Sequence, residues 1–191
     1  MAGVLGVVLA AGAGTRFGGA LKQLATFRGR PLVTWPLQAL REGGVEDVVV
    51  VLGAHADAIA PVVEADTVVC DDWADGMSAS LRCAVSVAER RGAEAMMMVL
   101  GDQPLLTGAA VTKVLEAREP LAIAVRATYG GVPGHPTLIE SAMFTALAEL
   151  RGDTGARELL RGAAFVECEG LGRPDDADTP EALARLEDAG P

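Results

Sequence analysis

Short apolar runs alternate with amphipathic stretches along most of this chain. The apolar runs consist mainly of valine, leucine and methionine and carry few charges, which is typical of strands buried on both faces of a sheet. They predict strands at residues 4–9, 47–52, 67–70, 95–100, 121–127 and 164–168.

The stretches between these runs place apolar residues three or four positions apart, which favours helices with one buried face. Proline near the start or glycine near the end marks several of them, as is common at helix ends. They predict helices at residues 31–43, 54–64, 77–92, 154–160 and 179–186, one around 111–115, and one over 143–150 that Ser141 could cap.

Strands that alternate with helices predict an α/β fold, with helices packed on a mostly parallel sheet. A length of 191 residues suits one domain. The glycine- and proline-rich segment 129–136 is the only plausible boundary between lobes. Since ligands gather at the carboxyl ends of parallel strands, segments 12–22 and 101–104 are expected to face one crevice.

Composition narrows the class of protein. The formal net charge is −10 and no basic face is visible, which argues against a nucleic-acid partner. The three cysteines lie far apart in the sequence, which disfavours a zinc site or a disulfide scaffold. No apolar run reaches the roughly 18 residues of a membrane span, and no signal peptide is apparent. We expect a soluble cytoplasmic protein with no membrane partner.

The loop after the first predicted strand carries the most specific chemistry. Gly12 and Gly14 allow close approach of the backbone to an anion, and Arg16 and Lys22 add two positive charges. The loop is not a dinucleotide fingerprint, because Phe17 stands where that pattern needs glycine, and it lacks the ending of a P-loop. Glycines alone would indicate an ordinary turn, but the two cations predict a triphosphate-binding loop.

Carboxylates near two other predicted elements are candidate magnesium ligands. Asp102 lies in a turn directly after the strand at 95–100, where a carboxylate could bind Mg²⁺ together with phosphates and waters. A second ligand could be Asp178 or Asp176, which the sequence does not separate. The alternatives are structural: Asp102 could bond its own turn, and acids before Thr179 could stabilise a helix start.

The ordered set of short motifs resembles the nucleotidyltransferases of molybdenum-cofactor synthesis, in the branch of the molybdenum cofactor (molybdopterin) cytidylyltransferases. The resemblance runs from about residue 4 to about residue 186. Its motifs are Leu9-Ala10-Ala11-Gly12 with Gly14, Arg16, Gly18 and Lys22, then Leu100-Gly101-Asp102-Gln103-Pro104, Trp73 with Gly76-Met77 and 78–82, Gly134-His135-Pro136, 152–157 and 176–181.

The resemblance implies a Rossmann-like three-layer αβα sandwich, similar to nucleotide-diphospho-sugar transferases, in one domain over 1–191. About 1–105 would bind the nucleotide and about 106–191 the acceptor. Alanine at position 11 instead of glycine points to CTP. The implied nucleotide-binding residues are Leu9, Ala10, Ala11, Gly12, Gly14, Arg16 and Lys22. The implied catalytic residues are Arg16, Lys22 and Asp102, with Mg²⁺ on Asp102 and Asp178.

Acceptor-binding residues follow from the resemblance in the same way: Met77, Ser78, Ser80, His135, Asp153 and Arg157. Each also has a structural interpretation. Met77 could pack in the core, His135 could be a structural residue beside prolines, and Asp153 and Arg157 could be a helix-start acid and a solvated arginine. Alternatively, the amide groups that open the helix at Met77 could bind the acceptor phosphate.

The expected reaction is attack of a molybdopterin phosphate on the α-phosphorus of CTP, with pyrophosphate as leaving group. A phosphate monoester has a second pKa near ~6, so no general base is required. The expected partners are these small molecules, with a recipient molybdenum hydroxylase as a further partner, and we expect a monomer. The alternatives are a related transferase with another nucleotide or acceptor, a non-catalytic module that carries the cofactor, and an NAD-binding oxidoreductase, which Phe17 disfavours.

Overall fold

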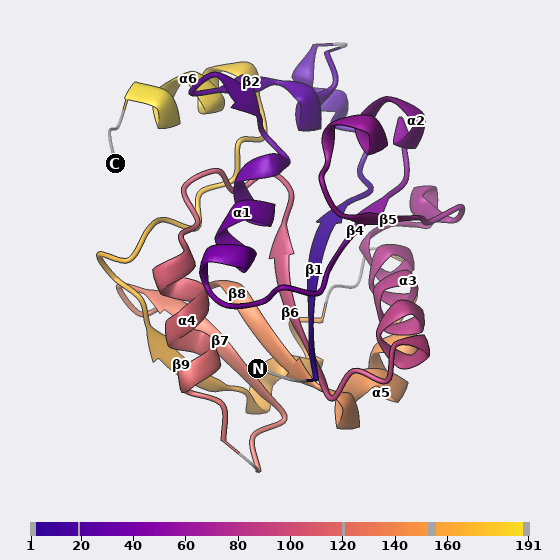
Figure 1. Cartoon of the computed structure of the whole chain (residues 1–191), viewed down its shortest axis with the longest axis vertical. Helices are drawn as coiled ribbons and strands as arrows, with labels where there is room; N and C mark the ends of the chain where they lie inside the picture. Colours follow the sequence, from indigo (N-terminus) through magenta and orange to yellow (C-terminus); the bar gives the residue numbers. More distant parts are fainter. Residues whose placement is uncertain (1–2, 19, 120, 153–155, 189–191) are drawn as a thin grey trace.

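A seven-stranded sheet forms the middle layer of the computed structural model, which describes residues 3–18, 20–119, 121–152 and 156–188 (Figure 1). The strand order is β5-β4-β1-β6-β8-β7-β9, and β8 alone runs antiparallel to its neighbours. The strands are β1 (Val4–Ala10), β4 (Val48–Leu52), β5 (Asp66–Val69), β6 (Ala95–Leu100), β7 (Ala124–Tyr129), β8 (Val132–Glu140) and β9 (Ala164–Glu167). A separate hairpin pairs β2 (Thr26–Phe27) with β3 (Arg30–Pro31).

Helices cover both faces of this sheet. Figure 1 shows α1 (Thr34–Glu42) and α4 (Gly108–Glu116) on one side, with α3 (Met77–Arg90) and α5 (Phe144–Ala148) on the other. The remaining α-helices are α2 (Ala56–Ile59) and α6 (Pro180–Asp188). Short 3₁₀ helices are η1 (Thr15–Phe17), η2 (Lys22–Leu24), η3 (Ala60–Val62), η4 (Trp73–Asp75), η5 (Ser141–Met143) and η6 (Leu159–Gly162). The three-layer αβα sandwich predicted from the sequence is confirmed.

Strand β1 illustrates why the central strands are apolar throughout. Successive side chains of a strand point to opposite faces. Leu5 and Val7 therefore pack with α3 and α5, whereas Val4 and Val8 pack with α1 and α4. Because helices remove both faces from water, every residue of β1 is buried. This burial fixes the point at which the chain leaves the sheet and enters the glycine loop.

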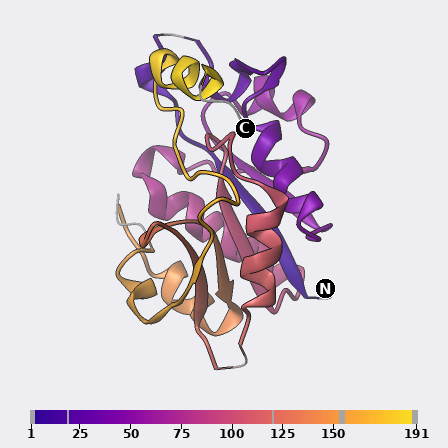
Figure 2. The ribbon, with the colours of Figure 1, turned by 90° about the vertical axis from the view of Figure 1, so that its left-hand side faces the viewer.

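A third, smaller apolar cluster holds the elements above the carboxyl edge of the sheet. Phe17 from the glycine loop packs there with Phe27 of the β2–β3 hairpin and with Leu183 and Leu186 of α6. Figures 1 and 2 show α6 and this hairpin side by side at one end of the molecule. The aromatic residue that breaks the dinucleotide pattern is thus an anchor that ties the loop to α6.

Several sequence predictions need correction. Pro31 lies in β3, and the helix predicted at 31–43 begins at Thr34. The segment 129–136 is no boundary between lobes, because it forms the end of β7, a turn and the start of β8 within the single large sheet. Strand β8 was missed because its prolines and glycine are unusual in a strand interior.

Two helix predictions in the second half of the chain are also wrong in detail. Ser141 is the first residue of η5 and not its cap, since the N-cap position is occupied by Glu140. The predicted helix at 154–160 is not an α-helix where it is described: residues 156–158 form a turn and η6 follows at Leu159–Gly162. Thr154 lies outside the described residues. The helix start at Thr179 is confirmed, since its Oγ1 accepts a hydrogen bond from the amide of Ala182 at 3.1 Å.

Across the part of the chain that the structure describes, no helix has both the length and the apolar character needed to cross a bilayer.

α1 and α4 pack so closely at Gly43 that this position has no room for a side chain. A Cβ built on Gly43 would lie 2.4 Å from Cβ of Val111 and 2.9 Å from the carbonyl oxygen of Gly108. We expect Gly43→Ala to lower the free energy of unfolding by about 1–3 kcal/mol through overpacking. Urea denaturation of the purified variant measures this loss.

The matched control is the double variant Gly43→Ala with Val111→Gly, which removes both Val111 atoms that a Cβ at position 43 would meet. Its loss of stability should be smaller than the sum of the two single losses, since the two sites are in contact. Simple additivity would contradict the steric explanation.

Candidate active site

The glycine loop leaves β1 at the carboxyl edge of the sheet and returns toward it through η2. Gly14 has a φ of 60°, and a Cβ there would lie 2.8 Å from Cβ of Lys22. A larger residue at position 14 would therefore be strained and would displace Lys22. This close approach turns the lysine side chain from η2 back toward the end of the sheet.

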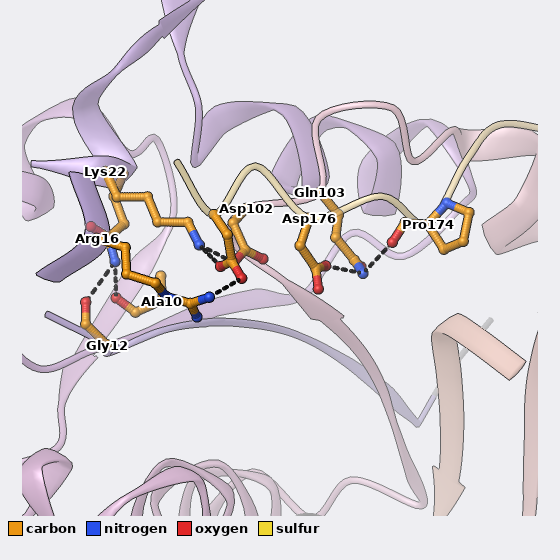
Figure 3. A network of polar contacts seen from close by, with 10 residues as sticks. Ala10, Gly12, Arg16, Lys22, Asp102, Gln103, Pro174 and Asp176 are labelled. Carbon is orange, nitrogen blue, oxygen red and sulfur yellow. Dashed lines mark hydrogen bonds and ion pairs between the residues drawn. The ribbon is translucent and has the colours of Figure 1, made fainter. Parts of the chain in front are cut away.

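Gln23 fixes the start of the loop. Its Nε2 donates to the carbonyl oxygens of Ala10, at 3.2 Å, and Gly12, at 2.9 Å. The side chain is buried, and Figure 3 shows these two bonds beside the ion pairs of the site. Sequence analysis did not identify Gln23, and the available signal was its position next to Lys22 in an otherwise apolar stretch. Gln23 thereby ties the start of the loop to η2.

The turn after β6 lies against the first loop. A Cβ on Gly101 would be 2.9 Å from Cβ of Ala10, so glycine is needed for the two turns to come this close. Asp102 follows, and its carbonyl oxygen accepts a hydrogen bond from the amide of Ala177 at 2.9 Å. The turn after β6 is thereby joined to the chain segment that leads into α6.

Gln103 strengthens that junction. Its Nε2 donates to the carbonyl oxygen of Pro174 at 3.0 Å and to Oδ1 of Asp176 at 2.8 Å (Figure 3). Burial raises the pKa of Asp176, and the charge of Asp102 adds to this effect. Gln103 was part of a recognised motif, but its role as a clamp on the 174–178 segment was not foreseen.

Lys22 joins three segments that are far apart in the sequence. Its Nζ lies 2.5 Å from Oδ2 of Asp102 and 2.7 Å from Oδ1 of Asp178. Burial by itself lowers the pKa of an amine, but the two carboxylates outweigh it and hold the pKa of Lys22 above its ordinary value. The hydrogen bond from Lys22 is the main cause that holds the pKa of Asp178 below its usual range. The lysine is therefore charged when it faces the pocket.

Arg16 extends the same charge network toward solvent. Its Nη1 lies 3.0 Å from Oδ2 of Asp178, and the side chain is 71% exposed. An exposed ion pair of this kind adds little stability. Arg16 is therefore available to exchange Asp178 for a phosphate group without loss of a strong contact.

These segments enclose a pocket of about 550 Å³, a size typical of sites for small molecules. Two candidate acceptor residues from the start of α3, Met77 and Ser80, also contribute to its wall, and Met77 is 48% exposed, so it is no core residue. The candidate nucleotide and metal residues that line the pocket are Leu9, Ala10, Ala11, Gly12, Gly14, Arg16, Lys22, Asp102 and Asp178. Trp73 and Gly76 complete the wall on the side of η4.

Three of the candidate acceptor residues that the structure describes do not line this pocket. Ser78 is fully buried, and its Oγ accepts a hydrogen bond from Arg82 at 3.1 Å, so it supports α3 rather than facing the pocket. His135 and Arg157 lie outside the wall. Asp153 lies outside the described residues. The structure thus brings the nucleotide and metal candidates together but only part of the acceptor set.

The carboxylates of the pocket suit a hard divalent cation. Oδ1 of Asp102 is buried and has no hydrogen-bond partner, which leaves an oxygen able to ligate. Within residues 3–18, 20–119, 121–152 and 156–188, no group of three or more His, Cys, Asp or Glu side chains could hold a metal ion. Asp102 and Asp178 therefore fit a cation that takes its remaining ligands from phosphates and water, as Mg²⁺ does.

Comparison with known proteins places this geometry in a family. The model of the MobA-like NTP transferase domain matches residues 6–168. A nicotine blue oxidoreductase of Paenarthrobacter nicotinovorans is 34% identical over an alignment of 198 positions that covers 96% of this chain and 96% of that protein. A bifunctional protein GlmU of Pelobacter propionicus is 35% identical over 118 residues, which cover 60% of this chain and 26% of that protein.

Solved structures of similar proteins have the same fold. Rv0371c of Mycobacterium tuberculosis superposes with a TM-score of 0.83 and 31% identity over 97% of both chains. A structure of Rv0371c in complex with manganese has a TM-score of 0.80 and 29% identity over 98% of this chain and 99% of that one. The nucleotide-diphospho-sugar transferase-like fold expected from the sequence is confirmed.

Gly12 offers a test of the pocket that is independent of the ion pairs. A Cβ on Gly12 would meet nothing within 4 Å, so the fold has room for a side chain there. We expect Gly12→Ala to change the free energy of unfolding by less than about 0.5 kcal/mol. A nucleoside triphosphate that uses this space should bind more weakly by about 1–3 kcal/mol, as in overpacking. Calorimetric titration with Mg²⁺ and each triphosphate measures this.

The control is Gly53→Ala, because a Cβ there would lie 2.6 Å from the carbonyl oxygen of Ala11 and 2.5 Å from Cβ of Trp73. That variant should lose stability. Unchanged triphosphate affinity in a stable Gly12→Ala protein would argue against this loop as the nucleotide site.

Proposed function

The chain belongs to the family of MobA-like NTP transferases, and on this premise we propose that it transfers CMP from CTP to the phosphate of a molybdopterin-type acceptor. The observation that carries the proposal is the pocket in which Lys22 and Arg16 meet Asp102 and Asp178 beside the glycine loop. The motif Leu9-Ala10-Ala11-Gly12, with alanine at its third position, supports CTP as the donor.

In the proposed reaction, an oxygen of the acceptor phosphate forms a bond to the α-phosphorus of CTP. The bond from the α-phosphorus to the bridging oxygen breaks, and pyrophosphate leaves with that electron pair. The nucleophile is an anion at neutral pH, so the protein supplies placement and charge neutralisation instead of a base. This suits a pocket whose ionisable groups are two cations and two carboxylates.

Each of these side chains has a separate task. Arg16, which is exposed, would bind the β- and γ-phosphates with its planar set of donors. Lys22, which is buried, would follow the charge that builds on the α-phosphate. Asp102 and Asp178 would hold Mg²⁺, which when bound neutralises phosphate charge and stabilises the leaving pyrophosphate. Asp178 is favoured over Asp176 because it lines the pocket, whereas Gln103 binds Asp176.

We also propose that residues up to about 105 act mainly on the nucleotide and those from about 106 on the acceptor, within one domain. The protein would act as a monomer in the cytoplasm and pass its product to a molybdenum hydroxylase.

The direct test is release of pyrophosphate with CTP, GTP, ATP or UTP, each with and without molybdopterin and Mg²⁺. The proposal requires release with CTP that depends on both the acceptor and the metal. Release with another triphosphate but not with CTP would overturn the assignment of CTP. Release with a different phosphorylated acceptor but not with molybdopterin would overturn the assignment of molybdopterin.

The name of one relative supports a second candidate function. The nicotine blue oxidoreductase matches this chain over 96% of its length, so a redox activity on nicotine blue is the alternative. Oxidation of NADH or NADPH in the presence of nicotine blue, without any pyrophosphate release in the first assay, would favour it over nucleotidyl transfer.

Lys22 gives the sharpest prediction for the proposed reaction. We expect Lys22→Ala to lower kcat at least about a hundredfold, the loss typical when one donor to a developing oxyanion is removed. Steady-state kinetics with CTP and the acceptor measure this, together with circular dichroism to show that the variant is folded.

The other lysine of the chain, Lys113, provides the matched control, since it lies on α4 outside the pocket. Lys113→Ala should keep its kcat. A folded Lys22→Ala protein with near-normal turnover would refute the role proposed for Lys22.

A further inference from the structure

A second cationic site lies on the acceptor side of the sheet, around Arg126 of β7. Ala124, two residues earlier, packs in the cluster under α3 and α5, while Val125 and Ala127 pack in the opposite cluster. Because strand side chains alternate, Arg126 leaves the sheet on the face covered by α3 and α5. This is also the face on which Leu9, Leu100 and the start of α3 form the nucleotide pocket.

Arg126 by itself lowers the stability of the fold. Its Nε is buried and has no hydrogen-bond partner, and none of the ion pairs among the described residues involves it. Its neighbours across the strands are Thr137 of β8 and Phe165 of β9, neither of which is charged. An enclosed donor without a partner is uncommon, and the described residues supply none, so the group is suited to a partner that binds from outside.

The neighbouring ionisable groups make the region around Arg126 more positive. Burial lowers the pKa of Arg126, and the charge of Arg157 lowers it further. Burial, followed by the charge of Arg126, lowers the pKa of His135 to about 4, so this imidazole is neutral at pH 7. Arg157 thus adds positive charge to the surroundings of Arg126, beside a neutral imidazole.

The strand register relates this region to the reaction centre. Thr137 of β8 pairs with Arg126 on one side and with Met98 of β6 on the other. Since neighbouring strands are about 4.8 Å apart, β7 lies roughly 10 Å across the sheet from β6, whose end carries Asp102. The chain before Arg157 also lies against α3, because the amide of Ser78 donates to the carbonyl oxygen of Gly152 at 3.3 Å.

We propose that Arg126, together with Arg157, forms an anion-binding subsite that holds an oxyanion group of the acceptor substrate, a phosphate or a carboxylate. The identity of the ligand as the acceptor rests on the proposed function, whereas the existence of the anion site does not. The subsite lies on the same face as the pocket, two strands across the sheet from β6 and level with Met98, which is four residues before Asp102. It therefore selects acceptors that carry an anionic group within reach of both positions.

The first experiment follows the arginine Nε–Hε signals of the full-length protein by NMR during titration with inorganic phosphate at constant ionic strength. The Arg126 signal is assigned by its loss in Arg126→Gln. We expect a saturable shift of this signal, with a parallel response of Arg157. Phosphate that enters the nucleotide loop shifts Arg16 instead, so the two sites are read separately. An Arg126 signal that does not move, or that responds equally to chloride, would overturn the subsite.

The second experiment uses kinetics. Arg126→Gln should raise KM for the acceptor roughly tenfold or more, as expected for loss of a charge-assisted hydrogen bond, and leave KM for CTP unchanged. Arg151→Gln is the matched control, because Arg151 is exposed and its hydrogen bonds among the described residues go to the carbonyl oxygens of Ala148 and Leu150. Equal KM for the acceptor in wild type and a folded Arg126→Gln protein would show that the anion bound there is not the acceptor.

The two experiments separate the two proposals. If no acceptor is turned over with any triphosphate, the proposed function fails, while the NMR titration still decides whether Arg126 binds an anion.

Discussion

The ammonium group of Lys22 is the interaction on which the site depends. It lies between Asp102, at the end of a central strand, and Asp178, before the last helix, and so closes three distant parts of the chain around one pocket. Burial of a single charge would be prohibitive, but each charge here has a partner of opposite sign. The glycine at position 14, the glycine at position 101 and the apolar anchor Phe17 all serve this contact, because each lets a segment come close enough for the charges to meet.

Much of the fold could be predicted because its causes are local in the sequence. Valine runs identify strands such as β4, and spaced apolar residues identify helices such as α3. The loop around Arg16 and the turn at Asp102 were recognisable because glycine and charge side by side have few structural uses. Strand β8 was not predictable in the same way, since its proline and glycine residues suit a turn, and only its pairing with β6 and β7 makes it a strand.

Residues that act through distant partners escaped sequence analysis. Gln23 matters because it binds carbonyl oxygens of the loop that precedes it, and Gln103 because it binds a segment about seventy residues away. Arg126 looked like one polar residue in a strand. Its significance comes from a buried Nε without a partner and from a neighbouring cation, and neither is visible until the sheet is assembled. Contacts of this kind depend on register, which a short apolar pattern leaves open.

The two cationic regions differ in a way that bears on specificity. The charge of Lys22 is already balanced by carboxylates, so the pocket can be stable without a ligand and exchange partners when phosphates arrive. No described carboxylate balances Arg126, so that region gains most from a ligand that brings negative charge. Relatives named for different activities match this chain, and function follows from the site more than from the fold. We therefore propose that the glycine loop and the turn that carries Asp102 bind the donor, while side chains on β7 and β8 decide which acceptor is taken.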